Sequence, residues 1–221
     1  MVTTPEFDLD LYEQRLREWD RLLSDTHSST LKDLLQAAKS ATENGLKRFA
    51  ELQHMSLVIM AARKITFEKS MVEYTALLKQ ITQDIELATA SRTPMPGRAE
   101  YYADLIKQVK DQATKEKTVY DLSIEVYSLA ITQFQKVLIL IYQPRNGAFH
   151  YESIIEACQT IAEKLIPGLS EFKSIRKWIP SIRKKAFAGT SDKLLLYVEQ
   201  YLDAMSKWEE LAGAYIELLN D

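Results

Sequence analysis

The sequence is poor in the residues that make turns and cross-links. It holds one cysteine, six glycines and six prolines in 221 residues. All-β proteins need many turns, so the scarcity of glycine and proline favours a small number of long helices. A single cysteine excludes a disulfide within the chain. One cysteine and three histidines also argue against a zinc site, and we expect neither a metal nor a cofactor.

Long apolar runs are missing as well. The longest uncharged apolar stretch covers residues 137–142, whereas a membrane-spanning helix needs roughly 18 apolar residues. The chain begins MVTTPEFDLD, which is acidic and lacks the apolar core of a signal peptide. The net charge is −3, so any contact with a polyanion must come from a local patch. We therefore expect a soluble, cytoplasmic protein without a signal peptide or transmembrane helix.

Helical periodicity fills the stretches between the groups of turn residues. One heptad frame runs from Tyr102 to Ile141, and ten of its twelve positions are apolar or aromatic, which predicts a single uninterrupted helix there. The pair Asn44–Gly45 leaves a break open in the preceding helical stretch. The sequence predicts helices over about 8–24, 30–92, 98–143 and 191–220, and a broken helical segment over 148–188.

The turn between the two longest stretches sets their direction. Residues 93–97 read TPMPG, which no helix interior tolerates and which is short. The helices over 30–92 and 98–143 should therefore run antiparallel. We predict an all-α protein with a single domain over residues 1–221, an elongated bundle of about five to seven helices whose long members are antiparallel.

One short motif has residue types that suit metal-independent RNA cleavage. Arg145, Asn146 and His150 stand in the sequence RNGAFH, directly before a predicted helix. Histidine titrates near neutrality and can transfer a proton at the 2′-hydroxyl or the leaving oxygen. Arginine can pair two phosphate oxygens with its planar guanidinium. Side chains five residues apart at a helix start can meet at that end, where free N–H groups also favour an anion.

This motif resembles the R-N-x-x-x-H signature of the HEPN superfamily, all-α proteins that include metal-independent ribonucleases of toxin and antiviral systems. The resemblance covers about residues 120–166, and its specific part is six residues long. It implies an endoribonuclease with Arg145 and His150 as the catalytic pair and Asn146 as the residue that orients them. It also implies a homo-oligomer, because many members place two motifs face to face. Tyr151 adjoins the histidine here, whereas some toxin members have a tyrosine two residues after it.

A basic segment follows the motif. Residues 172–187 read FKSIRKWIPSIRKKAF, with apolar residues at alternating spacings of three and four and a proline at position 180. Such a segment can lie on an anionic membrane, contact RNA phosphates, bind an acidic partner, or cover the end of the bundle with its apolar side buried. The candidate phosphate- or membrane-binding residues are Lys173, Arg176, Lys177, Arg183, Lys184 and Lys185.

Two functions other than RNA cleavage stay open from the sequence. The first is a non-enzymatic helical-bundle protein that acts at membranes, as a pore-forming toxin subunit or a lipid-surface binder. The second is a helical scaffold or adaptor that binds a helical partner protein. Cys158 stands at helical spacing with three apolar residues, so we expect it in the core rather than in a reactive site. His27 stands in a polar turn, and we expect it at the surface.

Overall fold

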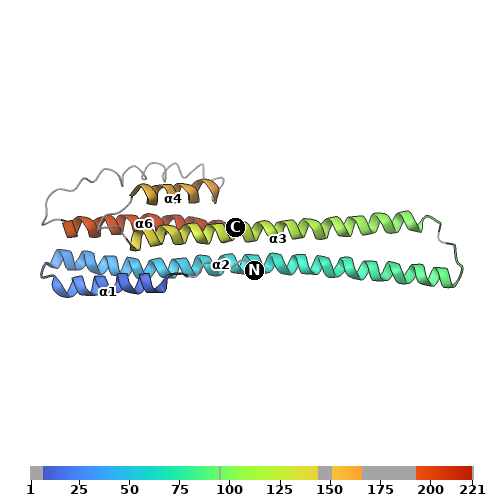
Figure 1. Ribbon diagram of the computed structural model, residues 1–221, viewed down its shortest axis with the longest axis horizontal. Helices are drawn as coiled ribbons and strands as arrows, with labels where there is room; N and C mark the ends of the chain where they lie inside the picture. Colours follow the sequence, from blue (N-terminus) through green and yellow to red (C-terminus); the bar gives the residue numbers. More distant parts are fainter. Residues whose placement is uncertain (1–6, 95, 144–150, 166–192, 221) are drawn as a thin grey trace. The chain divides into compact units, whose positions relative to one another are not determined.

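The computed structural model describes residues 7–94, 96–143, 151–165 and 193–220. These residues form five α-helices and no strand (Figure 1), which confirms the all-α prediction. They divide into two compact units. Unit 1 comprises residues 1–56 and 128–221, as far as these are described, and unit 2 comprises residues 57–127. The helices are α1 (Leu9–Asp25), α2 (Ser29–Ala90), α3 (Arg98–Tyr142), α4 (Tyr151–Lys164) and α6 (Lys193–Asn220).

The two longest helices agree with the predicted heptad pattern. Helix α3 is uninterrupted over its 45 residues, as the single heptad frame predicts. Helix α2 continues through Asn44 and Gly45 for a total of 62 residues, so this pair does not break it. Glycine weakens a helix by roughly 1 kcal/mol relative to alanine but does not forbid one. The surrounding packing therefore decides whether the helix continues through this position.

Unit 2 is an antiparallel hairpin made of the second part of α2 and the first part of α3 (Figure 1). Helix α2 stops where Arg92 takes a positive φ of 49° and the Thr93 N–H donates to the Ala88 carbonyl at 3.0 Å, the kind of left-handed cap that ends many helices. The Phe67 and Tyr120 rings stack across the hairpin with centroids 6.1 Å apart. Nearer the turn, the Tyr102 hydroxyl donates to Asp84 at 2.9 Å. These contacts confirm the antiparallel prediction within unit 2.

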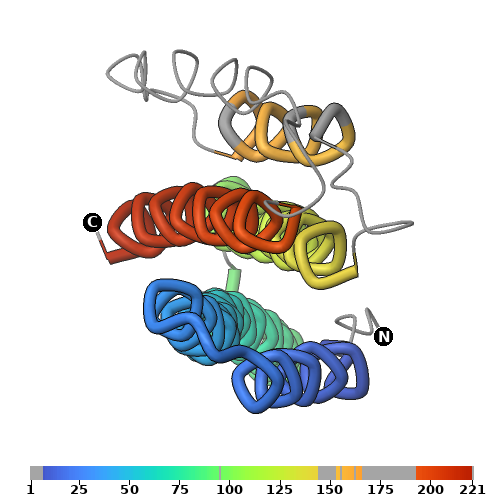
Figure 2. The backbone as a smooth tube through the Cα atoms, turned by 90° about the vertical axis from the view of Figure 1, so that its left-hand side faces the viewer, coloured from blue at the N-terminus to red at the C-terminus, as the bar shows by residue number. Residues whose placement is uncertain are grey.

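Unit 1 holds most of the buried apolar side chains. Figure 2, which looks along its helices, shows α4 against α6, α6 beside α3, and α1 beside α2. Trp208 of α6 is fully buried, and its indole N–H donates to the Phe134 carbonyl of α3 at 3.0 Å. The ring of Phe134 meets that of Trp208 edge-to-face, with centroids 6.1 Å apart. Aromatic residues of α1, α3 and α6 therefore build the core on which this unit depends.

Gly45 lies where α2 approaches two other helices of unit 1. A Cβ atom at this position would stand 2.5 Å from the Met205 methyl carbon and 2.9 Å from the Tyr142 hydroxyl oxygen. Both distances are shorter than van der Waals contact. The glycine in the sequence thus marks a close approach of helices, not the end of one.

Enlarging Gly45 should destabilise unit 1. We expect Gly45→Leu to lower the free energy of unfolding by about 1–3 kcal/mol, the usual effect of overpacking a filled core. Gly213 is the matched control, because it is also helical but a Cβ added there would meet no atom within 4 Å other than those of its chain neighbours and the adjacent backbone of its own helix. Gly213→Ala should raise stability by up to about 1 kcal/mol through helix propensity alone. Urea denaturation measures both, and a neutral Gly45→Leu would contradict the close approach.

Candidate functional site

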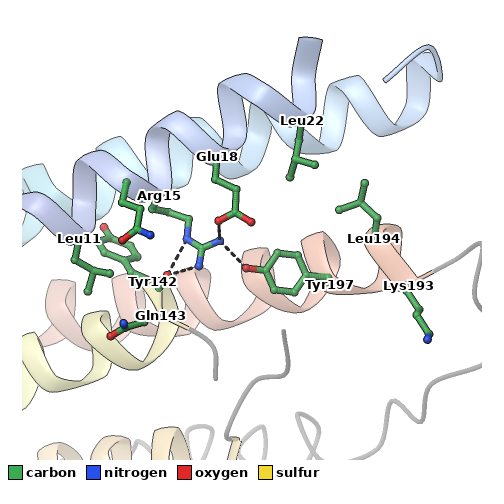
Figure 3. A pocket seen from close by; sticks show the side chains of 10 residues that line it. Leu11, Arg15, Glu18, Leu22, Tyr142, Gln143, Lys193, Leu194 and Tyr197 are labelled. Atoms are coloured by element: carbon green, nitrogen blue, oxygen red, sulfur yellow. Dashed lines mark hydrogen bonds and ion pairs between the residues drawn. The ribbon is translucent and has the colours of Figure 1, made fainter. Parts of the chain in front are cut away.

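A pocket lies at the C-terminal end of α3, within unit 1 (Figure 3), and its volume is about 460 Å³. Helix α1 contributes Leu11, Arg15 and Glu18 to its lining, α3 contributes Tyr142, and the start of α6 contributes Tyr197. The lining also includes residue 143, which follows α3 and directly precedes the segment that contains the RNGAFH motif. Apolar walls with a few convergent polar groups are typical of binding sites.

The Arg15 side chain holds the end of α3. It is 5% exposed, its Nε donates to the Tyr142 carbonyl at 2.8 Å, and its Nη2 donates to the same oxygen. Its Nη1 donates to Glu18 Oε2 at 2.8 Å and to the Tyr197 hydroxyl at 2.6 Å (Figure 3). The last carbonyls of a helix lack partners within the helix and carry its negative dipole end. The buried Arg15 guanidinium gives the last carbonyl its hydrogen bonds and places a positive charge at the negative end of the helix dipole.

Aromatic rings surround the same guanidinium. Its carbon lies 5.2 Å from the ring centroid of Trp19, 5.8 Å from that of Tyr201 and 5.9 Å from that of Tyr197. Cation–π attraction over such distances lowers the cost of burying the charge. Arg15 is therefore neutralised and enclosed by groups of the chain itself. Its role is to join α1, α3 and α6, and its guanidinium is already engaged in contacts within the chain.

A second polar network lies beside Arg15. The Thr42 hydroxyl donates its one proton to the Ala38 carbonyl at 2.8 Å and accepts from the Trp19 indole at 3.0 Å. The Tyr201 hydroxyl must then be the donor in its own close contact with Thr42. The Tyr142 hydroxyl donates to the Thr42 carbonyl at 3.1 Å. One threonine thus connects three buried aromatic residues.

Burial raises the pKa of these phenols. Desolvation is the main cause at Tyr142, Tyr197 and Tyr201, and it raises the pKa of each phenol above the ordinary value near 10. In the unfolded chain they ionise near pH 10. Above that pH the unfolded state binds fewer protons than the folded state, so stability falls as the pH rises.

An alkaline titration should reveal this linkage. At one pH unit above 10, each phenol that stays protonated only in the folded state should cost about 1.4 kcal/mol of stability. Urea denaturation at pH 8 and pH 11 measures the loss, and absorbance at 295 nm measures phenolate formation. If all tyrosines ionise together near pH 10 while the protein remains folded, the buried network is wrong.

Sequence reasoning did not identify Arg15, although a signal was present. Leu11, Arg15 and Trp19 follow one another at four-residue spacing, so the arginine stands on the apolar stripe of α1. All three are buried. A charge at such a position must find partners when the stripe packs. Its main partner, the Tyr142 carbonyl, is 127 residues away in sequence, and no local pattern indicates that pairing.

The predicted catalytic and phosphate-binding residues lie outside the described residues. Arg145, Asn146 and His150 belong to the stretch 144–150, and the six basic candidates from Lys173 to Lys185 belong to the stretch 166–192. Their predicted roles stay predictions. Within the described ranges, no group of three or more histidine, cysteine, aspartate or glutamate residues could hold a metal ion.

The structure does describe two residues that could have been mistaken for reactive groups. Cys158 is buried in α4, and desolvation raises the pKa of its thiol to about 12, so it is a core residue as predicted. His27 is exposed between α1 and α2, also as predicted.

One property of α3 bears on the expected absence of a membrane-spanning helix. Among the described residues, α3 alone contains an 18-residue window with the length and composition to cross a membrane, with a mean hydropathy of 1.4 and 39% of the window buried. The sequence expectation considered uncharged runs, whereas such a window tolerates two charged residues. Core helices of soluble proteins have the same composition, so the window by itself is weak support for membrane insertion.

Comparison with known proteins does not assign this chain to a family. No family model, no curated protein and no solved structure matches this chain.

Proposed function

We propose that this chain is a helical interaction protein in which unit 2 presents apolar helix faces to a partner. The supporting observation is the contrast between the units. Among the described residues, unit 1 buries 27 apolar side chains, whereas unit 2 buries only Ile81 and Ala113. Unit 2 leaves ten large apolar side chains exposed: Leu57, Val58, Ile65, Met71, Val72, Ile85, Leu87, Tyr101, Leu122 and Val126.

The physical argument rests on what a helix hairpin can bury. Most of the stability of a helix in a protein comes from packing its apolar face against another element. Two helices bury one seam between them, and the remaining apolar residues of unit 2 face water. Several of these are more than half exposed, including Ile65 at 65% and Val72 at 68%. Apolar side chains gathered on a surface in this way mark sites of interaction.

Photo-crosslinking in the producing cell tests this proposal. A benzophenone amino acid replaces Val72 in one variant and Arg17 in the control, because Arg17 has a side chain 74% exposed on unit 1. We expect a discrete adduct from position 72 and only diffuse background from position 17, with mass spectrometry identifying the partner. The absence of a discrete adduct from position 72 would overturn the proposal.

A second candidate function is the metal-independent ribonuclease that the RNGAFH motif predicts. It is supported by the helix boundaries: α3 ends at Tyr142 and α4 begins at Tyr151, so in the sequence the motif falls between these two helices and directly before the N-terminus of α4, the end of a helix that favours an anion. The pocket beside Arg15 lies where α3 ends and this segment of the chain starts. The arginine and histidine of the motif could act on a single-stranded RNA phosphate by charge stabilisation and proton transfer.

Cleavage of single-stranded RNA in the presence of EDTA tests the second candidate. His150→Ala should reduce the rate roughly 100-fold or more, since general acid–base terms are of this size. Arg145→Ala should reduce it by a similar factor through lost charge stabilisation. His27→Ala is the matched control, because this exposed histidine is not in the motif. An inactive wild type, or activity that survives both motif substitutions, would dispose of the ribonuclease.

A further inference from the structure

The pocket at the C-terminal end of α3 carries one positive charge that no other lining group balances. Its charged lining residues are Arg15, Glu18 and Lys193. Arg15 and Glu18 form an ion pair at 2.8 Å and neutralise each other. Lys193, the first residue of α6, is exposed and has no ion-pair partner among the residues that the structure describes. The lining as a whole therefore favours an anion.

The guanidinium of Arg15 also has one hydrogen-bond donor without an acceptor. Of its five N–H bonds, Nε and one on Nη2 bind the Tyr142 carbonyl, and the two on Nη1 bind Glu18 and the Tyr197 hydroxyl (Figure 3). The second N–H of Nη2 has no acceptor within the described part of the chain. The Arg15 side chain is only 6% exposed, so this donor has little contact with bulk water. A buried donor needs an acceptor, and because Arg15 lines the pocket, a molecule bound there can supply one.

The walls that α1 and α6 give to the pocket are apolar. Leu22 of α1 and Leu194 of α6 are both half-buried, and their side chains point toward each other across the space between the two helices (Figure 3). Tyr197, whose hydroxyl binds Arg15, follows Leu194 by three residues on the same helix and adds its ring to the lining. An aliphatic chain that lies against these side chains is removed from water, which favours its binding.

We propose that this pocket binds a small amphipathic anion, a molecule with a single carboxylate and an aliphatic body. A carboxylate oxygen accepts the remaining Arg15 N–H in a charge-assisted hydrogen bond. Lys193 supplies the second cation, so Glu18 and the carboxylate of the ligand together face two positive charges. The aliphatic body of the ligand lies against Leu22 and Leu194.

The size and position of the pocket fit such a ligand. Its volume of about 460 Å³ is within the range of small-molecule sites. The N-terminal end of α6, which is the positive end of its dipole, contributes Lys193 and Leu194 to the lining. A phosphate monoester would bring up to about two negative charges, more than the one unbalanced positive charge of the lining. All lining residues belong to unit 1, so this inference does not depend on what unit 2 binds.

Calorimetric titration of the full chain with octanoate tests the proposal. We expect one site per chain, with a dissociation constant of about 100 µM. Octan-1-ol has the same chain but no charge, and it should bind at least about 10-fold more weakly because it forms no charge-assisted hydrogen bond. Octanoate that shows no saturable binding up to about 5 mM, or that binds no more tightly than the alcohol, would overturn the proposal.

A charge reversal at the pocket tests where octanoate binds. Lys193→Glu gives the lining a net negative charge and should weaken binding about 10-fold at low ionic strength. Lys32→Glu is the matched control, because Lys32 is also an exposed lysine in the first turn of a unit 1 helix but does not line the pocket. An acidic residue near a helix N-terminus is favourable, so both variants should fold as the wild type does. Equal affinities of the two variants would contradict the site.

Filling the pocket gives an independent measurement. Leu22→Trp places a large ring between α1 and α6 and should abolish detectable octanoate binding, while far-UV circular dichroism shows the helicity of the wild type because Leu22 is only half-buried. Leu23→Trp is the matched control, since Leu23 is half-buried on the same helix but does not line the pocket. If the Leu22→Trp variant binds octanoate as tightly as the Leu23→Trp variant, the assignment to this pocket is wrong.

Discussion

Arg15→Ala is expected to lower the free energy of unfolding by about 3–5 kcal/mol. This one substitution removes the hydrogen bonds to the Tyr142 carbonyl, to Glu18 and to the Tyr197 hydroxyl. The loss is of this size because the buried Tyr142 carbonyl loses its side-chain donors, at about 1–3 kcal/mol, and the packing of the buried side chain against the aromatic rings is lost with them, whereas Glu18 is 40% exposed and can bind water. Trp19 and Trp208 lie in the core of unit 1, so tryptophan fluorescence during urea denaturation follows the unit that contains the change.

Arg17→Ala is the matched control for Arg15. Arg17 lies two residues away on α1, is 74% exposed, and approaches Glu13 at 3.9 Å. Exposed ion pairs contribute about 0–1 kcal/mol, so this variant should unfold almost as the wild type does. Equal effects of the two substitutions would show that Arg15 does not join the helices as described.

Trp208→Ala is the second change with a large expected effect, also about 3–5 kcal/mol. Its side chain is fully buried, so truncation leaves a cavity between α3 and α6 in addition to the lost transfer energy. Trp208→Phe keeps an aromatic ring but loses the N–H donor to the Phe134 carbonyl. Because that carbonyl belongs to a helix, we expect the phenylalanine variant to lose only about 1–2 kcal/mol.

Chemical denaturation measures whether Trp208→Ala loses more free energy of unfolding than Trp208→Phe. The Arg15 guanidinium binds the Tyr142 carbonyl and the Tyr197 hydroxyl, whereas the Trp208 indole binds the Phe134 carbonyl. Because the two side chains use different hydrogen-bond partners, the double variant Arg15→Ala, Trp208→Phe should show nearly additive losses. A phenylalanine variant as unstable as the alanine variant would mean that the indole hydrogen bond, and not the filled volume, is the main contribution of Trp208.

The helices could be predicted because their signals are local and repeated. The frame from Tyr102 to Ile141 never slips, and α3 follows it from Arg98 to Tyr142. The TPMPG turn cannot be helical, and the reversal of direction occurs there. Gly45 was harder to interpret, since the same residue that can end a helix can also admit another helix closely. Only the positions of Met205 and Tyr142 distinguish the two meanings.

The pocket at the end of α3 could not be predicted from sequence because its contacts are long-range. Arg15 meets Tyr142 and Tyr197 from positions 127 and 182 residues apart, and no pattern of spacing encodes such pairs. The RNGAFH motif shows the opposite case: it is easy to find in the sequence, and it lies outside the described residues. A motif identifies a chemistry, whereas the partners of a buried charge emerge only after the helices pack.

The division of the chain into units has a consequence for synthesis on the ribosome. Unit 2 is continuous in sequence, whereas unit 1 is assembled from residues on both sides of it. At about 5–20 residues per second, roughly 4–14 s separate the appearance of residue 56 from that of residue 128. During this interval the hairpin of unit 2 is being synthesised, and Trp19 and Phe49, both fully buried in the finished fold, have neither the unit 1 part of α3 nor α6 to cover them. The nascent chain therefore carries the first half of the unit 1 core uncovered until the hairpin is complete and the second half of unit 1 has followed it.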